Sequence, residues 1–434
     1  MATPFSPKFQ NAIFSPALAV RGLNLPYAPR SYATRCDMPV NAIAGMLGGT
    51  ARLRHRNRVP FRRIRAKFPL FTIRSDGTKV TEIDIAGNIT IACAIEYPFN
   101  SGTYYQFTFG GATSKTTTCA AENGVLVSDW LYLPFQIKAE AGFQTRTFIQ
   151  CAATGAFYGS VYTSSSYSEG TAYSATTPVD ASASGTITNG FNFAYGPCEL
   201  QTDGTVPCVV LSGSSSAYGT GDSASGDNNG CFGASAQYMW RCGMGLLKLA
   251  CPGERSSVAD AATTWKYRLQ LAAGTSPQIV IFHSVSNDII ASGSYVTLQD
   301  IINGQKNCIN LYKAVVPNIK TVGSPIQPRT TTTDAYASDG YQTAVAGLTP
   351  TGSGLRESWN DGLTGGSITI YDAILPGTAE MTESPTRRGV WINSTGGAGP
   401  GTANYATTDG IHKTAALHLL CAQNQPLDAL WKII

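Results

Sequence analysis

Between residues 68 and 109, the hydrophobic positions occur in short runs that predict β-strands. These runs are rich in β-branched and aromatic residues, alternate in part with polar ones, and are separated by turn residues; they cover 68–73, 80–85, 89–95 and 104–109. The segment 158–189 is rich in Ser, Thr, Tyr and Gly, which indicates a long loop or an edge excursion. We therefore expect an accessory β-sandwich or jelly-roll domain over residues 51–200.

The pattern changes after about residue 200. Apolar runs at 206–211 and 279–282 alternate with two segments of helical character, 234–249 and 297–314. Such alternation favours an α/β domain with a parallel sheet, which we place over residues 201–434.

Residues 1–50 have no sustained hydrophobic period, which predicts an extended or partner-bound N-terminal arm. No apolar run reaches the roughly 18 to 20 residues that a membrane-spanning helix needs. The first 25 residues make a poor secretory signal, because Pro4, Pro7 and Pro16 interrupt the apolar part and Lys8 lies inside it. Localisation stays open, with extracellular and virion-associated placement both compatible.

The composition agrees with two folded domains rich in turns. The chain has 434 residues, more than a single hydrophobic core usually serves, and it contains 45 glycines, 23 prolines and only 13% charged residues. It also has 11 cysteines, an odd number, with no CxxC pair and no Cys/His cluster that indicates zinc. The sequence therefore predicts no metal site and assigns no disulfide pairing.

The net charge of +4 hides an uneven distribution. Eight basic residues occur in one short stretch without any acid: Arg52, Arg54, Arg56, Arg58, Arg62, Arg63, Arg65 and Lys67. The other 23 of the 31 basic residues are outnumbered by 27 acidic ones. Many capsid proteins bind nucleic acid through an Arg-rich segment that precedes a jelly roll. This stretch therefore has two interpretations, a nucleic-acid-binding arm and a solvated or interface strand.

The strand predicted at 206–211 leads directly into a turn of small residues that contains Ser215. A serine at this place projects from the carboxyl edge of a parallel sheet, where α/β proteins place ligands. The turn resembles the first sequence block of the SGNH (GDSL-like) hydrolases, with Gly213 before the serine and Gly219 after it. Ser214 stands where that family has Asp.

Two later segments resemble the second and third blocks of the same family. Residues 249–256 resemble the second block, and the resemblance implies that the backbone N–H of Gly253 binds an oxyanion. Asn287 follows the strand at 279–282, and the resemblance implies that its side-chain amide does the same. Val285 stands where the family has glycine.

The segment 408–416 resembles the last block, Asp-x-x-His before a final helix, with Asp409 and His412 at the matching positions. The resemblance covers about half the chain. It implies a flavodoxin-like, three-layer SGNH hydrolase domain behind a β-domain, as in some bacterial and phage-encoded proteins. Ser215, His412 and Asp409 are then the catalytic triad, and Ser215, Gly253 and Asn287 form the oxyanion hole.

The implied function is a serine esterase that hydrolyses carboxylic esters through an acyl-enzyme and needs no cofactor. Acylated carbohydrate is the first choice of substrate, followed by small-molecule esters. We expect no nucleic-acid partner, while a homo-oligomer or attachment to a phage particle stays open.

Three alternatives remain at this stage. A literal Gly-Asp-Ser motif places the nucleophile at Ser223 instead, although no strand precedes it directly. The Arg-rich stretch and β-domain suit a structural virion protein, of phage tail or capsid type. Ser214 and Val285 suit a catalytically inactive SGNH fold that only binds.

Overall fold

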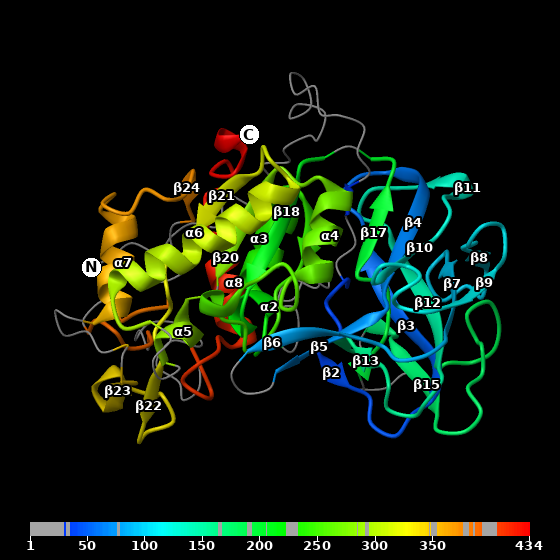
Figure 1. The fold of residues 1–434 in the computed structure, drawn as a ribbon, viewed down its shortest axis with the longest axis horizontal. Helices are drawn as coiled ribbons and strands as arrows, with labels where there is room; N and C mark the ends of the chain where they lie inside the picture. The colour runs from blue at the N-terminus through cyan, green and yellow to red at the C-terminus, as the bar shows by residue number, and fades with distance from the viewer. Residues whose placement is uncertain are drawn as a thin grey trace, which may run out of the picture.

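The computed structural model describes residues 30–31, 35–75, 79–163, 167–188, 193–204, 206–222, 233–283, 285–290, 295–346, 348, 354–375, 382–384, 387–392 and 406–434. The chain folds into an all-β part followed by an α/β part (Figure 1).

Two antiparallel sheets build the all-β part. The first contains β1 (Arg30–Ser31), β4 (Phe61–Pro69), β10 (Val125–Val127), β11 (Leu131–Ile137) and β17 (Glu199–Thr202). The second contains β3 (Gly48–Arg56), β7 (Ile89–Glu96), β8 (Tyr104–Gln106), β9 (Ser114–Thr117), β12 (Gly142–Cys151) and β15 (Gly170–Ser174). The predicted all-β architecture is confirmed, whereas the jelly-roll connectivity stays a prediction.

Four short two-stranded ladders complete the antiparallel structure. They pair β2 (Asn41–Ala42) with β13 (Tyr158–Gly159), β5 (Phe71–Ser75) with β6 (Val80–Asp84), β14 (Val161–Tyr162) with β16 (Phe193–Ala194), and β22 (Thr330–Thr332) with β23 (Gln342–Ala344). The run 68–73, expected as one strand, is divided at Leu70 between β4 and β5. Strand β15 forms the edge of its sheet, as expected for an excursion within 158–189.

The Arg-rich stretch forms parts of strands β3 and β4. Along β3 the arginines alternate with the buried side chains of Leu53 and His55, so the period of two that defines a strand is present. Strand β12 pairs with β3 from Gly142↔Arg56 to Gln150↔Gly48. Lys67, near the end of β4, is buried. All of these cations except Arg58, which lies between the two strands, therefore belong to folded strands.

A five-stranded parallel sheet forms the centre of the α/β part. It contains β18 (Cys208–Gly213), β19 (Gly245–Lys248), β20 (Ile279–His283), β21 (Lys320–Gly323) and β24 (Ala373–Ile374), in the order β19-β18-β20-β21-β24. Counted along the chain this order is 2-1-3-4-5, the flavodoxin-like arrangement. The chain reverses its direction of winding between β18 and β20, where such sheets open a crevice for ligands.

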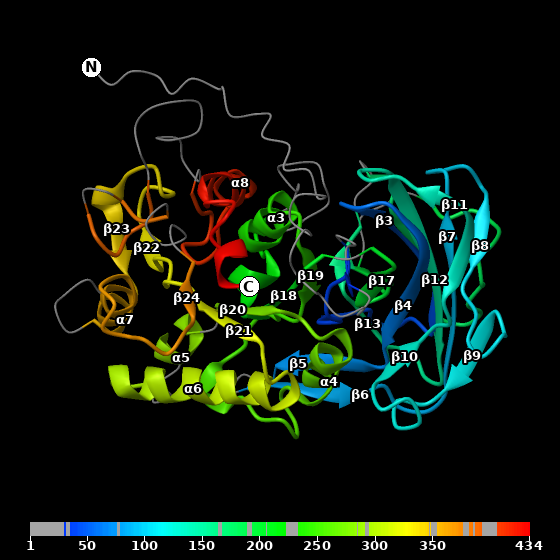
Figure 2. The ribbon, with the colours of Figure 1, turned by 90° about the horizontal axis from the view of Figure 1, so that it is seen from above.

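Helices cover both faces of the parallel sheet. They are α2 (Ser215–Tyr218), α3 (Ala234–Arg241), α4 (Lys266–Thr275), α5 (Ser286–Ile290), α6 (Leu298–Val315), α7 (Leu355–Thr364) and α8 (Ala415–Asn424), with short 3-10 turns at Ser256–Val258, Asp339–Tyr341 and Trp431–Ile433. Figure 2 shows α3 and α8 on one face and α4 and α6 on the other. The predicted three-layer α/β fold is confirmed.

The two helical predictions have different outcomes. Helix α6 agrees with the predicted 297–314 and begins with a capping box formed by Thr297 and Asp300. The segment 234–249 is helical only to Arg241, so the prediction is wrong for its second half. Gly243 adopts a positive φ of 68° and redirects the chain, and Gly245–Lys248 then pairs in parallel with β18.

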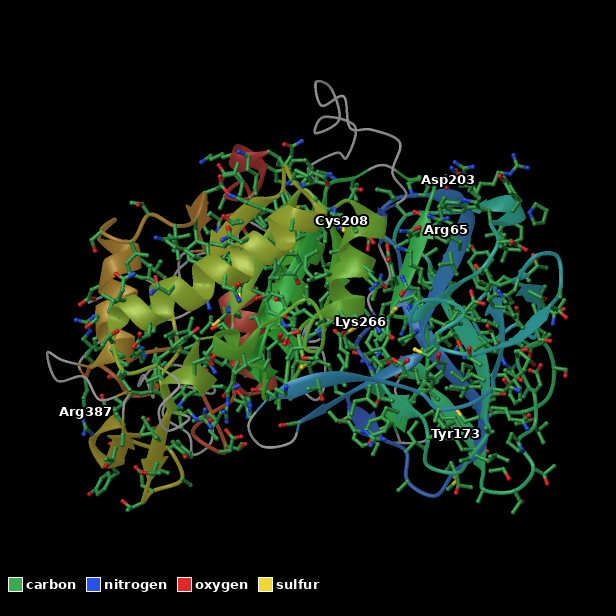
Figure 3. The ribbon with its side chains drawn as sticks, in the orientation of Figure 1. Arg65, Tyr173, Asp203, Cys208, Lys266 and Arg387 are labelled. Atoms are coloured by element: carbon green, nitrogen blue, oxygen red, sulfur yellow. The ribbon has the colours of Figure 1, made fainter. Side chains whose placement is uncertain are left out.

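The two parts share a continuous hydrophobic core. One cluster of buried side chains joins Phe68 and Phe71 of the β part to Leu247 and Phe282 of the α/β part. Figure 3 shows side chains filling the boundary, where Lys266 begins α4. The last strand of the antiparallel sheets ends at Thr202, close to the predicted boundary at residue 200. Independent folding of the two parts stays a prediction.

The N-terminal arm is described only in part. Residues 1–29 and 32–34 lie outside the described residues. Residues 35–39 are buried, and Lys248 of β19 forms a 2.8 Å ion pair with Asp37. The extended arm over 1–50 therefore stays a prediction for its first 29 residues, while its last part packs against the fold.

Ten of the 11 cysteines lie within the described ranges, and all ten are buried and free of disulfide bonds. In the same part of the chain, no helix is both long enough and apolar enough to cross a membrane. No cluster of three or more His, Cys, Asp or Glu side chains that could hold a metal ion occurs among the described residues.

The central position of β20 predicts a large stability cost for truncating its core. Ile281 is fully buried and its strand pairs on both sides, so Ile281→Ala should lower the free energy of unfolding by about 2–5 kcal/mol. Val296 is 71% exposed, and Val296→Ala should change it by less than about 0.5 kcal/mol. Urea denaturation of both variants measures the difference, and equal midpoints would contradict the assignment of β20 to the core.

Candidate active site

Ser215 begins helix α2 directly after the end of strand β18, as the sequence predicts. The turn between them passes through Gly213, whose φ of 151° lies in the region that glycine favours. A Cβ atom at this position would lie 2.6 Å from the carbonyl oxygen of His283. The absent side chain therefore lets the ends of β18 and β20 approach closely, and the Ser214 N–H donates to the same carbonyl over 3.0 Å.

The end of β19 joins the same edge of the sheet. The Cys251 N–H donates to the carbonyl oxygen of Gly213 over 2.9 Å. The loops that follow β18, β19 and β20 thus lie side by side at the point where the strand order reverses. This is the crevice in which open parallel sheets bind their ligands.

Asp409 organises the loop that contains His412. One carboxylate oxygen of Asp409 accepts the backbone N–H groups of Ile411 and His412, each over 2.8 Å. A β-bridge between Thr407 and Lys413 closes the loop. These bonds fix the turn, so the spacing of three residues brings the carboxylate and the imidazole together.

The structure brings Ser215, His412 and Asp409 into one hydrogen-bonded line. Nε2 of His412 lies 2.8 Å from Oγ of Ser215, and Nδ1 lies 2.7 Å from Oδ2 of Asp409. These distances are those of the Ser-His-Asp arrangement in which the imidazole can remove the hydroxyl proton. The serine and the histidine are 197 positions apart in the sequence.

The hydrogen bonds of the loop keep Asp409 ionised. Burial alone would raise the pKa of this carboxyl group, but the N–H groups of His412 and Ile411 and the imidazole outweigh it. The pKa is therefore below its ordinary value of 3.8. A charged carboxylate at Nδ1 favours the tautomer that leaves Nε2 free to accept a proton from the serine.

The other three histidines are held in buried, uncharged settings. Burial lowers the pKa of His55 and of His283 to about 3, and it lowers the pKa of His418 well below 6.5. His55 contacts Thr145, His283 contacts Ser235, and His418 accepts the backbone N–H of Ala234. Among the four, His412 alone bonds both a serine hydroxyl and a carboxylate.

Of the three oxyanion candidates, Asn287 contacts the loop that contains Gly253. The side-chain amide of Asn287 donates to the carbonyl oxygen of Glu254 over 3.1 Å, next to Gly253 in the chain. A side-chain amide has two N–H groups, so this bond leaves a second one for a ligand. Ser215 is the first residue of its helix, where a backbone N–H has no partner within the helix. The oxyanion roles stay predictions.

Asp288 reinforces the contact between these two loops. Its carboxylate accepts the N–H and the hydroxyl of Ser256 and the N–H of Ser257, each over 2.9 Å. The pair Asn287 and Asp288 therefore fixes the loop after β20 to the loop after β19.

The sequence did not point to Gln327. Its amide donates to Oγ of Ser216 over 2.6 Å and to the carbonyl oxygen of Ile411 over 2.7 Å, so it connects the turn that contains Ser215 to the loop that contains His412. A small pocket lies alongside, lined by Ser214, Ser216, His283, Val285, Ser286, Ser324, Pro325, Ile326, Gln327 and Lys413. No motif marks residues 324–327, because a glutamine in a loop is too common to indicate a site.

The alternative nucleophile Ser223 lies outside the described residues. Its neighbour Asp222 is buried and accepts the backbone N–H of Gly233 and the side-chain amide of Gln237, each over 2.8 Å. Asp222 thus binds the start of helix α3.

Comparisons with known proteins give structural matches only. No protein-family model matches the chain, and no curated protein matches its sequence.

Among solved structures, the chain is similar to SGNH (GDSL-like) carbohydrate esterases that carry an N-terminal β-domain. A family two carbohydrate esterase from Clostridium thermocellum, solved in complex with cellohexaose, shares 14% identity over 94% of each chain, with a TM-score of 0.33. A family 2 enzyme with a carbohydrate-binding domain from Corynascus thermopiles shares 11% identity over 92% of this chain and 97% of that one, with a TM-score of 0.34.

A carbohydrate acetylesterase from Sinorhizobium meliloti matches a smaller share of the chain. It shares 15% identity over 50% of this chain and 95% of that one, with a TM-score of 0.31.

The close approach of Gly213 to the carbonyl of His283 predicts that replacing this glycine lowers stability more than replacing other glycines. Gly213→Ala adds both an unfavourable φ and a contact with the carbonyl oxygen of His283, so it should lower the free energy of unfolding by about 2–4 kcal/mol. Gly243→Ala is the matched control, since Gly243 has a φ of 68° and no described atom lies within 4 Å of the place that a Cβ would take. Gly243→Ala should lower the free energy of unfolding by only about 1 kcal/mol. Equal losses in urea denaturation would contradict the close approach.

Proposed function

We propose that the protein is a serine esterase in which Ser215 is the nucleophile, His412 its general base and Asp409 the group that orients the histidine. The observation that carries this proposal is the continuous hydrogen-bonded line of 2.8 and 2.7 Å through the three side chains. Its position at the crevice of the parallel sheet supports the same conclusion.

The reaction proceeds in two steps. Oγ of Ser215 attacks the ester carbonyl carbon while Nε2 of His412 takes the hydroxyl proton. The tetrahedral intermediate then collapses, its C–O bond breaks, and His412 returns the proton to the departing alcohol. A water molecule, deprotonated by the same imidazole, attacks the acyl-enzyme, which releases the carboxylic acid and restores Ser215.

The oxyanion formed in each step needs hydrogen-bond donors at a fixed place. We assign this role to the backbone N–H groups of Ser215 and Gly253 and to the amide of Asn287. The bond from Asn287 to the Glu254 carbonyl supports the assignment, because it holds the amide beside the loop of Gly253. Removal of one such donor from a preorganised site typically costs about 3–4 kcal/mol in the transition state.

We further propose acylated carbohydrate as the substrate class. Tyr132 of β11 is 67% exposed, whereas Trp130, just before β11, is half-buried, with the guanidinium groups of Arg63 and Arg65 each 4.8 Å from its ring centre. Aromatic ring faces offer large, rigid contact areas to sugar rings. Release of acetate from acetylated polysaccharides, compared with hydrolysis of p-nitrophenyl acetate, measures this preference. Equal specificity for both would remove the carbohydrate assignment and leave the esterase.

Removal of the nucleophile or the base should abolish ester hydrolysis. Ser215→Ala and His412→Ala should each lower kcat for p-nitrophenyl acetate by at least about 10³-fold, because neither step proceeds without the activated hydroxyl. Initial rates, with circular dichroism to confirm folding, check this expectation.

Ser223→Ala is the matched control and should keep the activity of the wild type. Loss of activity in Ser223→Ala alone would move the nucleophile to that residue. A wild-type protein without activity toward any ester would favour the inactive, binding-only fold and overturn the proposal.

Asp409→Asn should lower kcat by about 10²- to 10⁴-fold while Ser215 remains in place, because the amide no longer enforces the tautomer of His412. The lowered pKa of Asp409 also predicts a pH dependence of stability. A carboxylate with a depressed pKa stabilises the fold above its unfolded value of about 3.9 and loses this effect as the pH falls through the folded value.

The difference in unfolding free energy between wild type and Asp409→Asn should therefore shrink as the pH falls from about 5 to about 3. Urea denaturation across this range measures it. A difference that grows toward low pH would contradict the direction of the shift.

A further inference from the structure

A hairpin of the all-β part extends beneath the α/β part. Figure 2 shows strands β5 and β6 on the same side of the parallel sheet as α4 and α6, away from α3 and α8. The Glu82 N–H donates to the carbonyl oxygen of Thr263 over 2.9 Å, and the Tyr267 hydroxyl donates to Asp84 over 2.6 Å. The hairpin is thus bonded to the segment that leads into α4.

The same hairpin reaches the loop that contains Gly253. A Cβ atom at Gly253 would lie 3.7 Å from a methyl group of Val80 and 3.8 Å from the hydroxyl of Ser75. The loop has a φ of 80° at Gly253 and therefore depends on glycine for its shape. One side of this loop is covered by a segment that comes from the other part of the chain.

Three buried charges connect the hairpin to this loop. Arg268 on α4 donates Nε to Glu82 and Nη1 to Glu254, each over 2.7 Å. The side chains of Arg268, Glu82 and Glu254 are 2%, 0% and 2% exposed. Arg268 also donates to the carbonyl oxygens of Leu249 and Thr264 over 2.9 and 2.6 Å, so the guanidinium is held on several sides.

Glu254 passes this constraint to Asn287. The carboxylate of Glu254 binds Arg268 and accepts the indole N–H of Trp265. The main-chain carbonyl of the same Glu254 accepts the side-chain amide of Asn287 over 3.1 Å. Fixing the side chain of Glu254 therefore fixes the backbone beside Gly253 and the direction of the Asn287 amide. Gly253 and Asn287 are both oxyanion donors under the proposed function.

We propose that Glu82 is a positioning residue for the oxyanion donors, acting across the boundary between the two parts through Arg268 and Glu254. This inference rests on the proposed esterase function. It makes the β part a contributor to the chemical step, in addition to any role in binding substrate. Donors of this kind act only when they are held in place before the reaction, so a loosened loop should slow the chemistry more than it weakens substrate binding.

The substitution Glu82→Gln tests the connection at constant size. It removes one of the two carboxylates that surround the single guanidinium, so Arg268 keeps Glu254 as its ion-pair partner. We expect kcat for p-nitrophenyl acetate to fall about 10- to 100-fold with KM changed less than about 2-fold, a loss smaller than that of a whole donor. Inhibition by phenylboronic acid, whose serine adduct is tetrahedral, should weaken by a similar factor.

Glu199→Gln is the matched control. Glu199 is also a fully buried carboxylate near α4, bonded to Lys67 over 2.7 Å and to the hydroxyl of Thr275 over 2.7 Å. These bonds lie at the opposite end of α4 from Lys266, away from the loop of Gly253. Glu199→Gln should lose stability but keep the kcat and the boronate affinity of the wild type.

Three outcomes would overturn the inference. The first is a kcat of Glu82→Gln equal to that of the wild type. The second is an equal loss of kcat in Glu82→Gln and Glu199→Gln, which would indicate a general packing effect. If Glu82→Gln does not fold, Glu82→Asp replaces it and should show a smaller loss of kcat at unchanged KM; unchanged kcat then overturns the inference. An inactive wild type would instead overturn the proposed function, and is measured first.

Discussion

The candidate site depends on how closely two neighbouring backbones approach at the end of the parallel sheet. Gly213 allows β18 to run directly against β20, and the N–H of Ser214 then bonds to the carbonyl of His283. A Cβ atom at residue 213 would lie 2.6 Å from the carbonyl oxygen of His283, so any other side chain would force the strands apart. Ser215, the loop after β19 and the loop after β20 are therefore positioned by main-chain contacts.

The boundary between the two parts is built from both apolar and charged contacts. The shared core removes apolar surface from water, which supplies most of the driving force for association. The buried ion pairs of Asp37 with Lys248 and of Glu82 with Arg268 contribute direction instead, because each charge must meet its partner at a defined distance. The relative placement of the two parts is thus fixed more closely than an apolar contact alone would require.

Much of the fold could be predicted from the sequence, because periodicity records which side chains are buried. Strands β7, β18 and β20 and helix α6 follow their predicted runs closely, whereas β8 covers only the first half of the predicted 104–109. The segment 234–249 failed because its apolar residues suit both a helix and a buried strand, and only the turn at Gly243 separates them. The break at Leu70 between β4 and β5 depends on contacts with strands that are distant in the sequence, and the local hydrophobic pattern does not record such contacts.

The geometry of the site was predictable where its residues lie in a motif. Ser215, Asp409 and His412 meet as their motifs indicated, and Asn287 lies against the loop of Gly253. Gln327 and Arg268 were not found, since each acts through partners that come from other parts of the chain. A single glutamine or arginine has no local pattern that distinguishes it from a surface residue.

The arrangement of the histidine loop has a consequence for how the site is completed during synthesis. Asp409 and His412 meet within one turn, so their alignment is local, whereas the hydroxyl of Ser215 must wait for a loop made almost 200 residues later. A ribosome-bound chain that already contains the whole parallel sheet still lacks its imidazole. The three side chains therefore come together only when the segment before α8 docks.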